Sequence, residues 1–268
     1  MEMMLLTYPS QWLAAVFYAM PRMLAMFSIV PMFNRQALPG LLRVGAAFAF
    51  AMFIVPSLVE PSLTISMHGT RVLAVVLKEA AIGFLLGFLI ALPLWAMDIM
   101  GAYIDNQRGA SIAATINPLT GHDTSPLGEL FSQAALVYLL MTGGMLMVLE
   151  LVYASYEAWP VYQMLPRFSD QMPTVLLGLM DKLMWLAVLL SAPVIFSMFL
   201  AEVGLGIVSR FVPQLQVFFL AMPVKSAIAI FVFSVYVGTL FGYLKEEYID
   251  FVTRSLDVVR SLLVPGAP

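Results

Sequence analysis

Charged side chains occur inside the most apolar part of the sequence, where they could bind an ion or a polar substrate. The stretch EVGLGIVSRFVPQLQVFFLAMPVKSAIAIF, residues 202–231, holds Glu202, Arg210 and Lys225. A charge at the centre of a bilayer costs roughly 2.5–3.5 kcal/mol on insertion scales, so such residues pair with other groups, line a wet path or form a transport site. One hypothesis is therefore a secondary transporter with a charged intramembrane site. The side chains available for that site are Lys78, Glu79, Glu150 and Glu202.

The residues that could support catalysis are few. The sequence has no cysteine and two histidines, and neither the HExxH metalloprotease pattern nor the GxSxG nucleophile turn occurs. His122 and Asp123 with Glu129 could be imagined as a metal cluster, but an ordinary polar loop explains them better. Glu150 and Glu157 stand two helical turns apart, and exposed or partner-bound glutamates are the simpler interpretation. We therefore expect no enzyme, no metal and no other cofactor.

The elements that must hold these residues are membrane helices. Of the 268 residues, 62% are hydrophobic and 11% charged, whereas a soluble domain is nearer half apolar and a quarter charged. Lipid offers no partner to open backbone groups, so each apolar stretch should be helical. We predict an all-α membrane protein with one domain, 1–268, and no cleaved signal peptide, because no basic residue precedes Arg22. The six expected segments are 10–33, 38–59, 72–97, 128–156, 174–201 and 215–243.

Prolines and paired glycines should shape these helices. GxxxG spacings at Gly83/Gly87 and at Gly238/Gly242 would let neighbouring backbones approach closely, although such spacings are also frequent by chance. Proline removes a backbone donor and clashes with the preceding turn, so kinked or broken helices are expected. The prolines concerned are Pro21, Pro56, Pro93, Pro193 and Pro223.

Two segments differ from the apolar stretches around them. The connection from Asp98 to Leu127 is polar, rich in small residues and long for a loop without regular structure, and such loops tend to be functional or disordered. Its core GASIAATI, residues 109–116, is mildly apolar and could pack inside another structure. At the other end, KEEYIDFVTRSLDVVRSLL, residues 245–263, repeats apolar residues at helical spacing, which predicts an amphipathic helix.

The number of charges suggests that the helices pack mainly against other proteins. Adjacent residues such as Lys78 and Glu79 do not face each other on a helix, so we expect their partners on other helices or other chains. If the chain crosses the membrane six times, four of the basic residues in its connections lie on one side and five on the other. This near-equal division predicts no orientation, because orientation follows an excess of basic residues on one side. No basic run indicates a nucleic-acid partner. The ionisable residues in or beside apolar stretches are Arg22, Arg43, Lys78, Glu79, Glu150, Asp181, Lys182, Glu202 and Lys225.

Three stretches resemble the export-apparatus T subunit of bacterial type III secretion systems, the SctT/FliR family. AEVGLGIVSRFVPQLQVFFLAMPVKSAIAI (201–230) has a glutamate before a glycine pair, then S-R, a proline, a glutamine, a phenylalanine-rich run and M-P-[VI]-K-S. PRMLAMFSIVPMFNRQALPGLLRVGAAFAF (21–50) is similar to the family's N-terminal P-x-F…P…R region. KEAAIGFLLGF (78–88) is similar to its K-E-x-x-[IL]-G-x-x-x-G segment. Together the matches extend from about Pro21 to Tyr248.

The resemblance implies a non-enzymatic subunit of an export gate in the bacterial inner membrane, within the type III secretion basal body. Its implied partners are R- and S-type subunits, the U-type switch subunit, inner rod or needle components, membrane lipid and the unfolded proteins in transit. The charges would then serve subunit interfaces or a water-filled lumen, with glycines allowing close packing and prolines setting breaks between short helices. The residues so assigned are Lys78, Glu79, Glu202, Gly204, Gly206, Arg210, Pro213, Gln214, Pro223 and Lys225.

The resemblance also implies that a loop at about 105–126 plugs the channel. Small polar residues with intermittent apolar ones suit a movable obstruction, and an ordinary exposed loop is the alternative. The amino-acid sequence of the signature resembles an injectisome, of the virulence or symbiosis type, more than a flagellar system. The plug or gate residues so implied are Asp105, Asn106, Gln107, Arg108, Gly109, Ser111, Thr115, Asn117 and Pro118.

Overall fold

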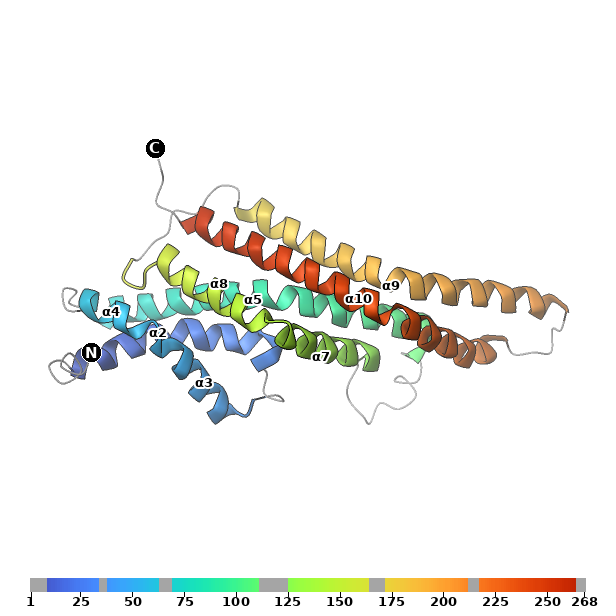
Figure 1. Cartoon of the computed structure of the whole chain (residues 1–268), viewed down its shortest axis with the longest axis horizontal. Coiled ribbons are helices and arrows are strands. Elements are labelled where there is room, and N and C mark those ends of the chain that lie inside the picture. The colour runs from blue at the N-terminus through green and yellow to red at the C-terminus, as the bar shows by residue number, and fades with distance from the viewer. Residues whose placement is uncertain are drawn as a thin grey trace. The chain divides into compact units, whose positions relative to one another are not determined.

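The computed structural model describes residues 9–33, 38–62, 69–110, 125–163, 172–211 and 217–263, and these residues form helices and short turns (Figure 1). The predicted all-α membrane fold is confirmed. In chain order the elements are α2 (Pro9–Ile29), the 3-10 helix η1 (Pro31–Phe33), α3 (Gly40–Met52), α4 (Val55–Ser62), α5 (Gly69–Arg108), α7 (Pro126–Met141), α8 (Gly144–Ala158), α9 (Met172–Phe211) and α10 (Val217–Leu263).

Among the described residues, four helices are long and apolar enough to cross a membrane, in place of the six expected segments. They lie in α2, α5, α9 and α10. α7 and α8 pass the same test only together, and they are bent by 81° at the break between them. Gly143 has φ +90° at this break, a backbone conformation that favours glycine. The segment expected at 128–156 is therefore two helices.

Several predicted boundaries are wrong because polar residues continue a helix. α5 is 40 residues long and includes Asp98–Arg108, which the sequence indicated as loop. α10 is 47 residues long and joins the segment at 215–243 to the amphipathic stretch at 245–263. Long side chains on such helices find partners on neighbouring helices, so a polar residue need not end the helix.

Prolines end fewer helices than predicted. Pro21, Pro93, Pro193 and Pro223 lie inside α2, α5, α9 and α10, and these helices continue through them. Pro56 differs, because it stands at the second position of α4, and α3 ends at Met52, four residues before it. A proline ring clashes with the carbonyl of the residue four positions earlier and leaves it without a donor, which accounts for the short pair α3 and α4 in the expected segment 38–59.

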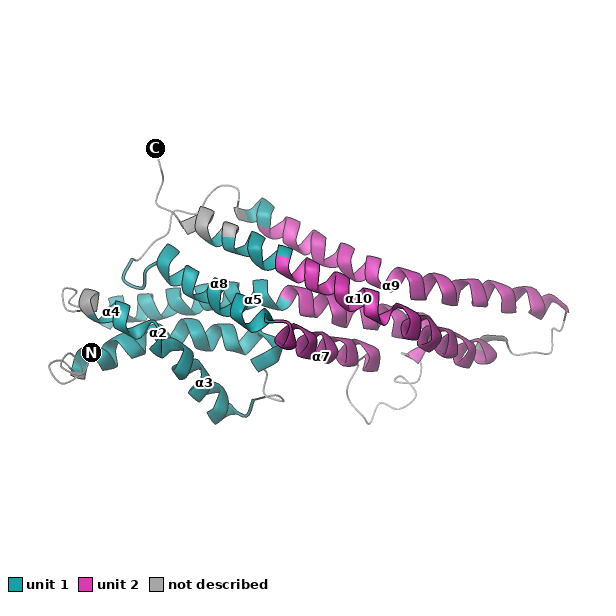
Figure 2. Cartoon of the chain, in the orientation of Figure 1, with its two compact units in different colours: residues 1–91, 143–175, 250–268 teal, residues 92–142, 176–249 magenta. Residues whose placement is uncertain are grey.

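The chain divides into two compact units, one of residues 1–91, 143–175 and 250–268 (unit 1) and one of residues 92–142 and 176–249 (unit 2) (Figure 2). Each has its own buried apolar core. In unit 1 the core includes Met23 and Phe27 of α2, Leu86 of α5 and Val152 of α8. In unit 2 the buried side chains come from α5, α7, α9 and α10, and include Met97, Met100, Ile104, Ala135, Leu190, Met198 and Leu240.

Candidate functional site

Unit 1 contains a fully buried ion pair between α2 and α5. The Arg22 Nε donates to Glu79 Oε2 at 2.7 Å, and both side chains are completely shielded from solvent. Lys78 Nζ lies 2.8 Å from Glu79 Oε1, so a single carboxylate balances two cations. The expectation that adjacent Lys78 and Glu79 could not pair is therefore wrong. Both are long side chains, and they bend toward the same point although their Cα–Cβ bonds diverge.

The remaining donors of this cluster are satisfied by α8 and the turn after it. Arg22 donates Nη1 to Ser155 Oγ and Nη2 to the Trp159 carbonyl, each at 3.0 Å, and its guanidinium lies 3.9 Å from the centre of the Tyr156 ring. Lys78 Nζ donates to the carbonyls of Pro160, Val161 and Gln163 at 3.2, 2.7 and 2.9 Å. Lys78 and Glu79 thus make their ion pairs and hydrogen bonds within the chain. The family resemblance had instead assigned them to a subunit interface or lumen.

Glycines bring α2 and α5 together beside this ion pair. A Cβ added to Gly83 would fall on the backbone carbonyl of Arg22, and one added to Gly87 would lie 2.8 Å from the carbonyl oxygen of Met26. The close contact predicted from this GxxxG spacing is confirmed. The same spacing at Gly238 and Gly242 has no neighbour within 4 Å among the described residues.

Unit 2 contains a second charged group, formed by α5, α9 and α10. Lys225 Nζ lies 2.7 Å from Glu202 Oε2 and donates to the Gln107 carbonyl at 3.2 Å. The Lys225 side chain is 11% exposed, whereas that of Glu202 is 50% exposed. Lys182 of α9 likewise pairs with Glu247 of α10 at 2.8 Å. These lysines find their partners on another helix of the same chain.

The end of α5 meets the start of α7 through Asp105. Its Oδ2 accepts from Ser125 Oγ at 2.6 Å and from the Leu127 N–H at 3.0 Å, while its Oδ1 accepts from Arg108 Nε at 2.7 Å. Ser125 in turn caps α7 by accepting from the Gly128 N–H at 2.9 Å. Sequence analysis placed Asp105–Arg108 in a plug loop, and the structure corrects this, because these residues form the last turn of α5.

The other residues predicted from sequence are scattered. Gly204 and Gly206 have no neighbour within 4 Å among the described residues, and Arg210 is exposed in the last turn of α9. Pro223 lies inside α10 and sets no break. Gly109 follows α5 with φ +84°, and Asn106 is exposed on its last turns. Ser111, Thr115, Asn117, Pro118, Pro213 and Gln214 lie outside the described residues.

Several residues that build these groups were missed from sequence. Arg22 was noted as a charge without a partner, and its contacts Ser155 and the Trp159 carbonyl lie more than 130 residues away. Ser125 carried a usable local signal, since serine followed by proline is a typical helix start. Gly101 carried none, although a Cβ there would collide with the backbone of Gly128 at the α5–α7 contact.

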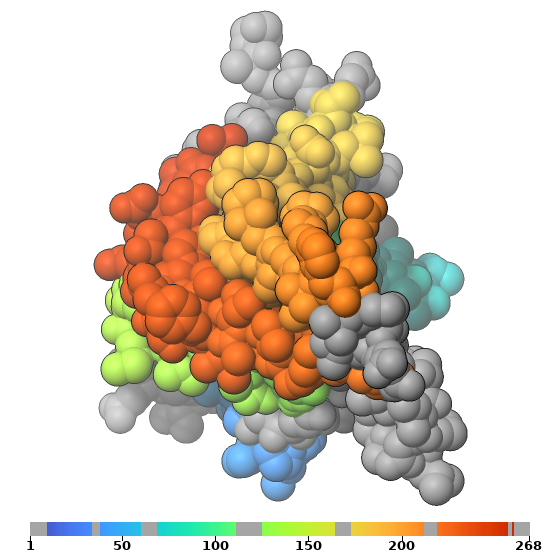
Figure 3. Space-filling model, turned by 90° about the vertical axis from the view of Figure 1, so that its right-hand side faces the viewer, coloured from blue at the N-terminus to red at the C-terminus, as the bar shows by residue number. Residues whose placement is uncertain are grey.

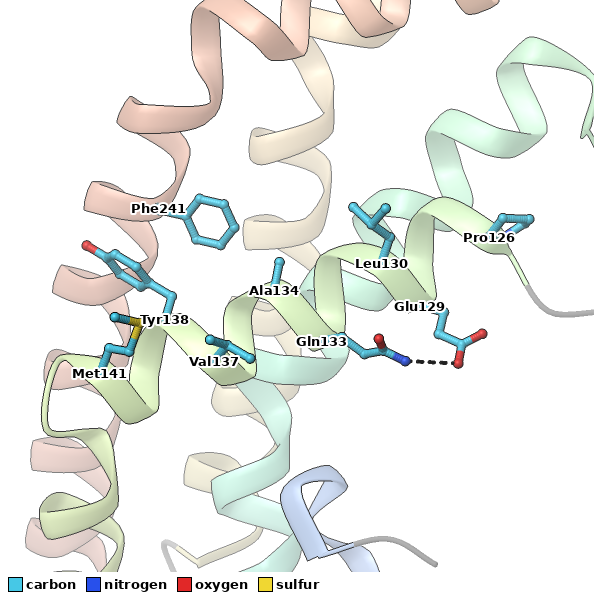
Figure 4. A pocket seen from close by; sticks show the side chains of 9 residues that line it. All are labelled: Pro126, Glu129, Leu130, Gln133, Ala134, Val137, Tyr138, Met141 and Phe241. Atoms are coloured by element: carbon cyan, nitrogen blue, oxygen red, sulfur yellow. Dashed lines mark hydrogen bonds between the residues drawn. The ribbon is translucent and has the colours of Figure 1, made fainter. Parts of the chain in front are cut away.

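One groove lies along α7 and has mostly apolar walls (Figure 4). Glu129 stands near one end of it, where its carboxylate accepts from the Gln133 side chain at 3.1 Å. Phe241 of α10 forms the opposite wall. Among the described residues, no three acidic or histidine side chains converge as metal ligands would; His122 and Asp123 lie outside them.

Comparison with known proteins gives a consistent result. The model of a family described as bacterial export proteins, family 1, matches residues 13–250. "Yop proteins translocation protein T" of Yersinia pestis is 37% identical over 218 residues, covering 81% of this chain and 83% of that protein. "Surface presentation of antigens protein SpaR" of Shigella flexneri is 32% identical, covering 82% and 84%. "Flagellar biosynthetic protein FliR" of Bacillus subtilis is 31% identical, covering 90% and 92%.

Proposed function

Because the chain belongs to the bacterial export proteins, family 1, we propose that it is a subunit of the type III secretion export gate in the bacterial inner membrane. Its relatives are components of export systems and not enzymes, and its apolar helices make it a multi-pass membrane protein. In the proposed gate it joins R- and S-type subunits, contacts the U-type switch subunit and inner rod or needle components, and passes unfolded proteins through a lumen.

The observation that carries this proposal is a half-exposed charge on a helix with an apolar surface. Around Glu202, α9 exposes Val203, Ile207 and Phe211. This end of α9 and the start of α10 occupy the face drawn in orange and red-orange in Figure 3. Lipid would cover the apolar side chains but would leave the Glu202 carboxylate poorly solvated. Partner helices together with a water-filled lumen accommodate both kinds of surface.

The open glycines beside Glu202 favour a partner helix over lipid. Small residues let helices approach closely inside a membrane, where no hydrophobic force drives helices together. Gly206 lies one turn after Glu202 on the same face of α9, and no described residue of this chain lies within 4 Å of a Cβ added there. We propose that a helix of another subunit covers α9 at Gly206.

A leucine in place of Gly206 should reduce assembly without harming the chain itself. No described residue lies within 4 Å of a Cβ added at this position, so we expect the added side chain to clash with a partner, at a cost of about 1–3 kcal/mol. Gly178→Leu is the matched control, because Gly178 is equally open on the same helix but lies outside the signature. Quantitative co-purification should show less complex for Gly206→Leu at an unchanged chain level. Equal recovery for both variants would argue against the partner helix.

The connection at 111–124 remains the proposed channel plug. What supports this is the position of its two ends in unit 2. The end of α5 contacts the Glu202–Lys225 pair through the Gln107 carbonyl, and the start of α7 is joined to the end of α5 by the hydrogen bond from Ser125 to Asp105. The alternative of a secondary transporter has lost two of its candidate residues. Lys78 and Glu79 are buried and already paired with Arg22 and backbone carbonyls, so they are not available to bind and release a substrate.

A further inference from the structure

We propose that the groove along α7 takes an apolar helix of a partner subunit, with a lysine or arginine of that helix opposite Glu129. The groove is bounded by α7 and by Phe241 of α10, and both belong to unit 2 (Figure 4). The inference rests on the proposed function, since it takes the partner to be another subunit of the export gate. Its new content is the place where that helix docks and the charge that it must carry.

The α7 helix has two apolar stripes, and the residues that the structure describes bury only one of them. Residues that recur every three or four positions lie on one face of a helix. The buried stripe consists of Gly128, Phe131, Ala135 and Leu139. The second stripe lines the groove and consists of Leu130, Ala134, Val137 and Met141. All of these except Ala134 are more than half exposed. A helix that is apolar on a second face needs a second apolar neighbour.

The shape of the groove suits a helix. It has a volume of about 820 Å³ and extends from Pro126 to Met141, which is about 22 Å at the rise of an α-helix. Ala134 lies midway, one turn from the larger Leu130 and one turn from Tyr138. This small residue leaves a hollow that a side chain of a packed helix can fill.

The glycine pair of α10 favours a helix over an acyl chain as the occupant. Gly238 precedes Phe241, the opposite wall of the groove, by one turn of α10. No described residue lies within 4 Å of a Cβ added at Gly238 or at Gly242. Small residues at GxxxG spacing let a membrane helix approach closely, an advantage that a flexible lipid tail does not need.

The charge at one end of the groove selects the partner. The Glu129 carboxylate is exposed and accepts from the Gln133 side chain, a neutral donor, at 3.1 Å. Asp98 lies close by, since a Cβ added to Gly128 would be 2.5 Å from Asp98 Oδ1. None of the ion pairs within the described part of the chain includes either carboxylate. Two unbalanced negative charges are complementary to a basic side chain on the occupant, and they repel an anionic lipid headgroup.

The test places a photoreactive amino acid at Val137 of the tagged chain, expressed with its native partner genes. Val137 lines the groove and is exposed, so a cross-linker at this position reaches whatever occupies the groove. The purified complex is irradiated, and mass spectrometry identifies the cross-linked product. We expect one apolar peptide of another membrane subunit, with a lysine or arginine in the same helix.

Charge variants of the cross-linking chain test the role of Glu129. Glu129→Lys reverses the charge in the groove. The matched control is Glu246→Lys, which reverses an exposed carboxylate of α10 in the same unit but outside the groove. Like charges at an interface oppose association, so the product should fall roughly tenfold for Glu129→Lys and stay unchanged for the control. Glu129→Gln, which keeps the shape of the side chain, should give a smaller reduction. An acidic residue in place of the partner's basic one should restore the product of Glu129→Lys.

The outcomes separate the inference from the proposed function. A product with a lipid, or with another part of this chain, in a complex that still contains R- and S-type subunits would overturn the inference alone. Equal products for Glu129→Lys and Glu246→Lys would also overturn it, as would a loss in Glu129→Lys that the charge exchange does not restore. A purified chain without other membrane subunits would instead overturn the proposed function, and the inference with it.

Discussion

Replacing Glu79 by alanine is expected to reduce sharply the amount of folded chain. Arg22 would stay fully buried without a counter-charge, and Lys78 would lose its carboxylate partner. Removing one member of a buried ion pair costs about 3–5 kcal/mol, a large share of the roughly 5–15 kcal/mol that stabilises a typical protein. The measurement is the recovery of the chain in mild detergent and the midpoint of its thermal aggregation.

Two further variants show whether the effect comes from burial and charge. Glu157→Ala removes an exposed glutamate from α8 in the same unit, and such surface changes stay within about 0.5 kcal/mol. The aggregation midpoint of Glu79→Gln should lie between those of Glu79→Ala and Glu157→Ala. The amide oxygen of glutamine can still accept a hydrogen bond from Arg22, but it carries no charge. Equal aggregation midpoints for Glu79→Ala and Glu157→Ala would contradict the importance of the buried pair.

Gly83→Ala should separate α2 from α5 and destabilise unit 1. The new methyl group would fall on the Arg22 carbonyl, and its nearest obstacles are all backbone atoms that cannot rotate away. Overpacking of this kind costs about 1–3 kcal/mol, and the shift would also strain the Arg22–Glu79 pair. We expect a lower aggregation midpoint and a lower yield of the isolated chain.

Gly238→Ala is the matched control for this variant, because Gly238 lies in the other GxxxG pair and no described residue is within 4 Å of a Cβ added there. Alanine favours a helix over glycine by about 0.8–1.0 kcal/mol, so the isolated chain should be unchanged or slightly more stable. A fall in stability as large as that of Gly83→Ala would contradict the packing described here. If Gly238 faces another subunit, only the yield of the assembled complex should fall.

These glycine pairs also show what the sequence could predict. The spacing at Gly83/Gly87 and at Gly238/Gly242 is identical, yet among the residues that the structure describes only the first pair meets another helix. A local pattern states that close approach is allowed, and it carries no information on which surface approaches. The helical class and the apolar spans were predictable because they depend on composition and local periodicity alone.

The sequence shows that charged residues lie within apolar stretches, but it does not show which of them pair with one another. A helix projection excluded contact between Lys78 and Glu79, yet two flexible side chains reach the same buried point together with Arg22. Asp98–Arg108 was interpreted as loop because its residues are polar, whereas Asp105 is satisfied by the start of α7. In both cases the deciding partner is distant in sequence, and no local rule could identify it.

The most direct test of the central claim is affinity purification of the tagged chain, expressed with its native partner genes, followed by the mass of the intact complex in mild detergent. A gate subunit should be recovered in one large assembly with R- and S-type membrane subunits. Recovery as a stable monomer or a small homo-oligomer would contradict the gate. The half-exposed Glu202 and its partner Lys225 would then become candidates for a transport site.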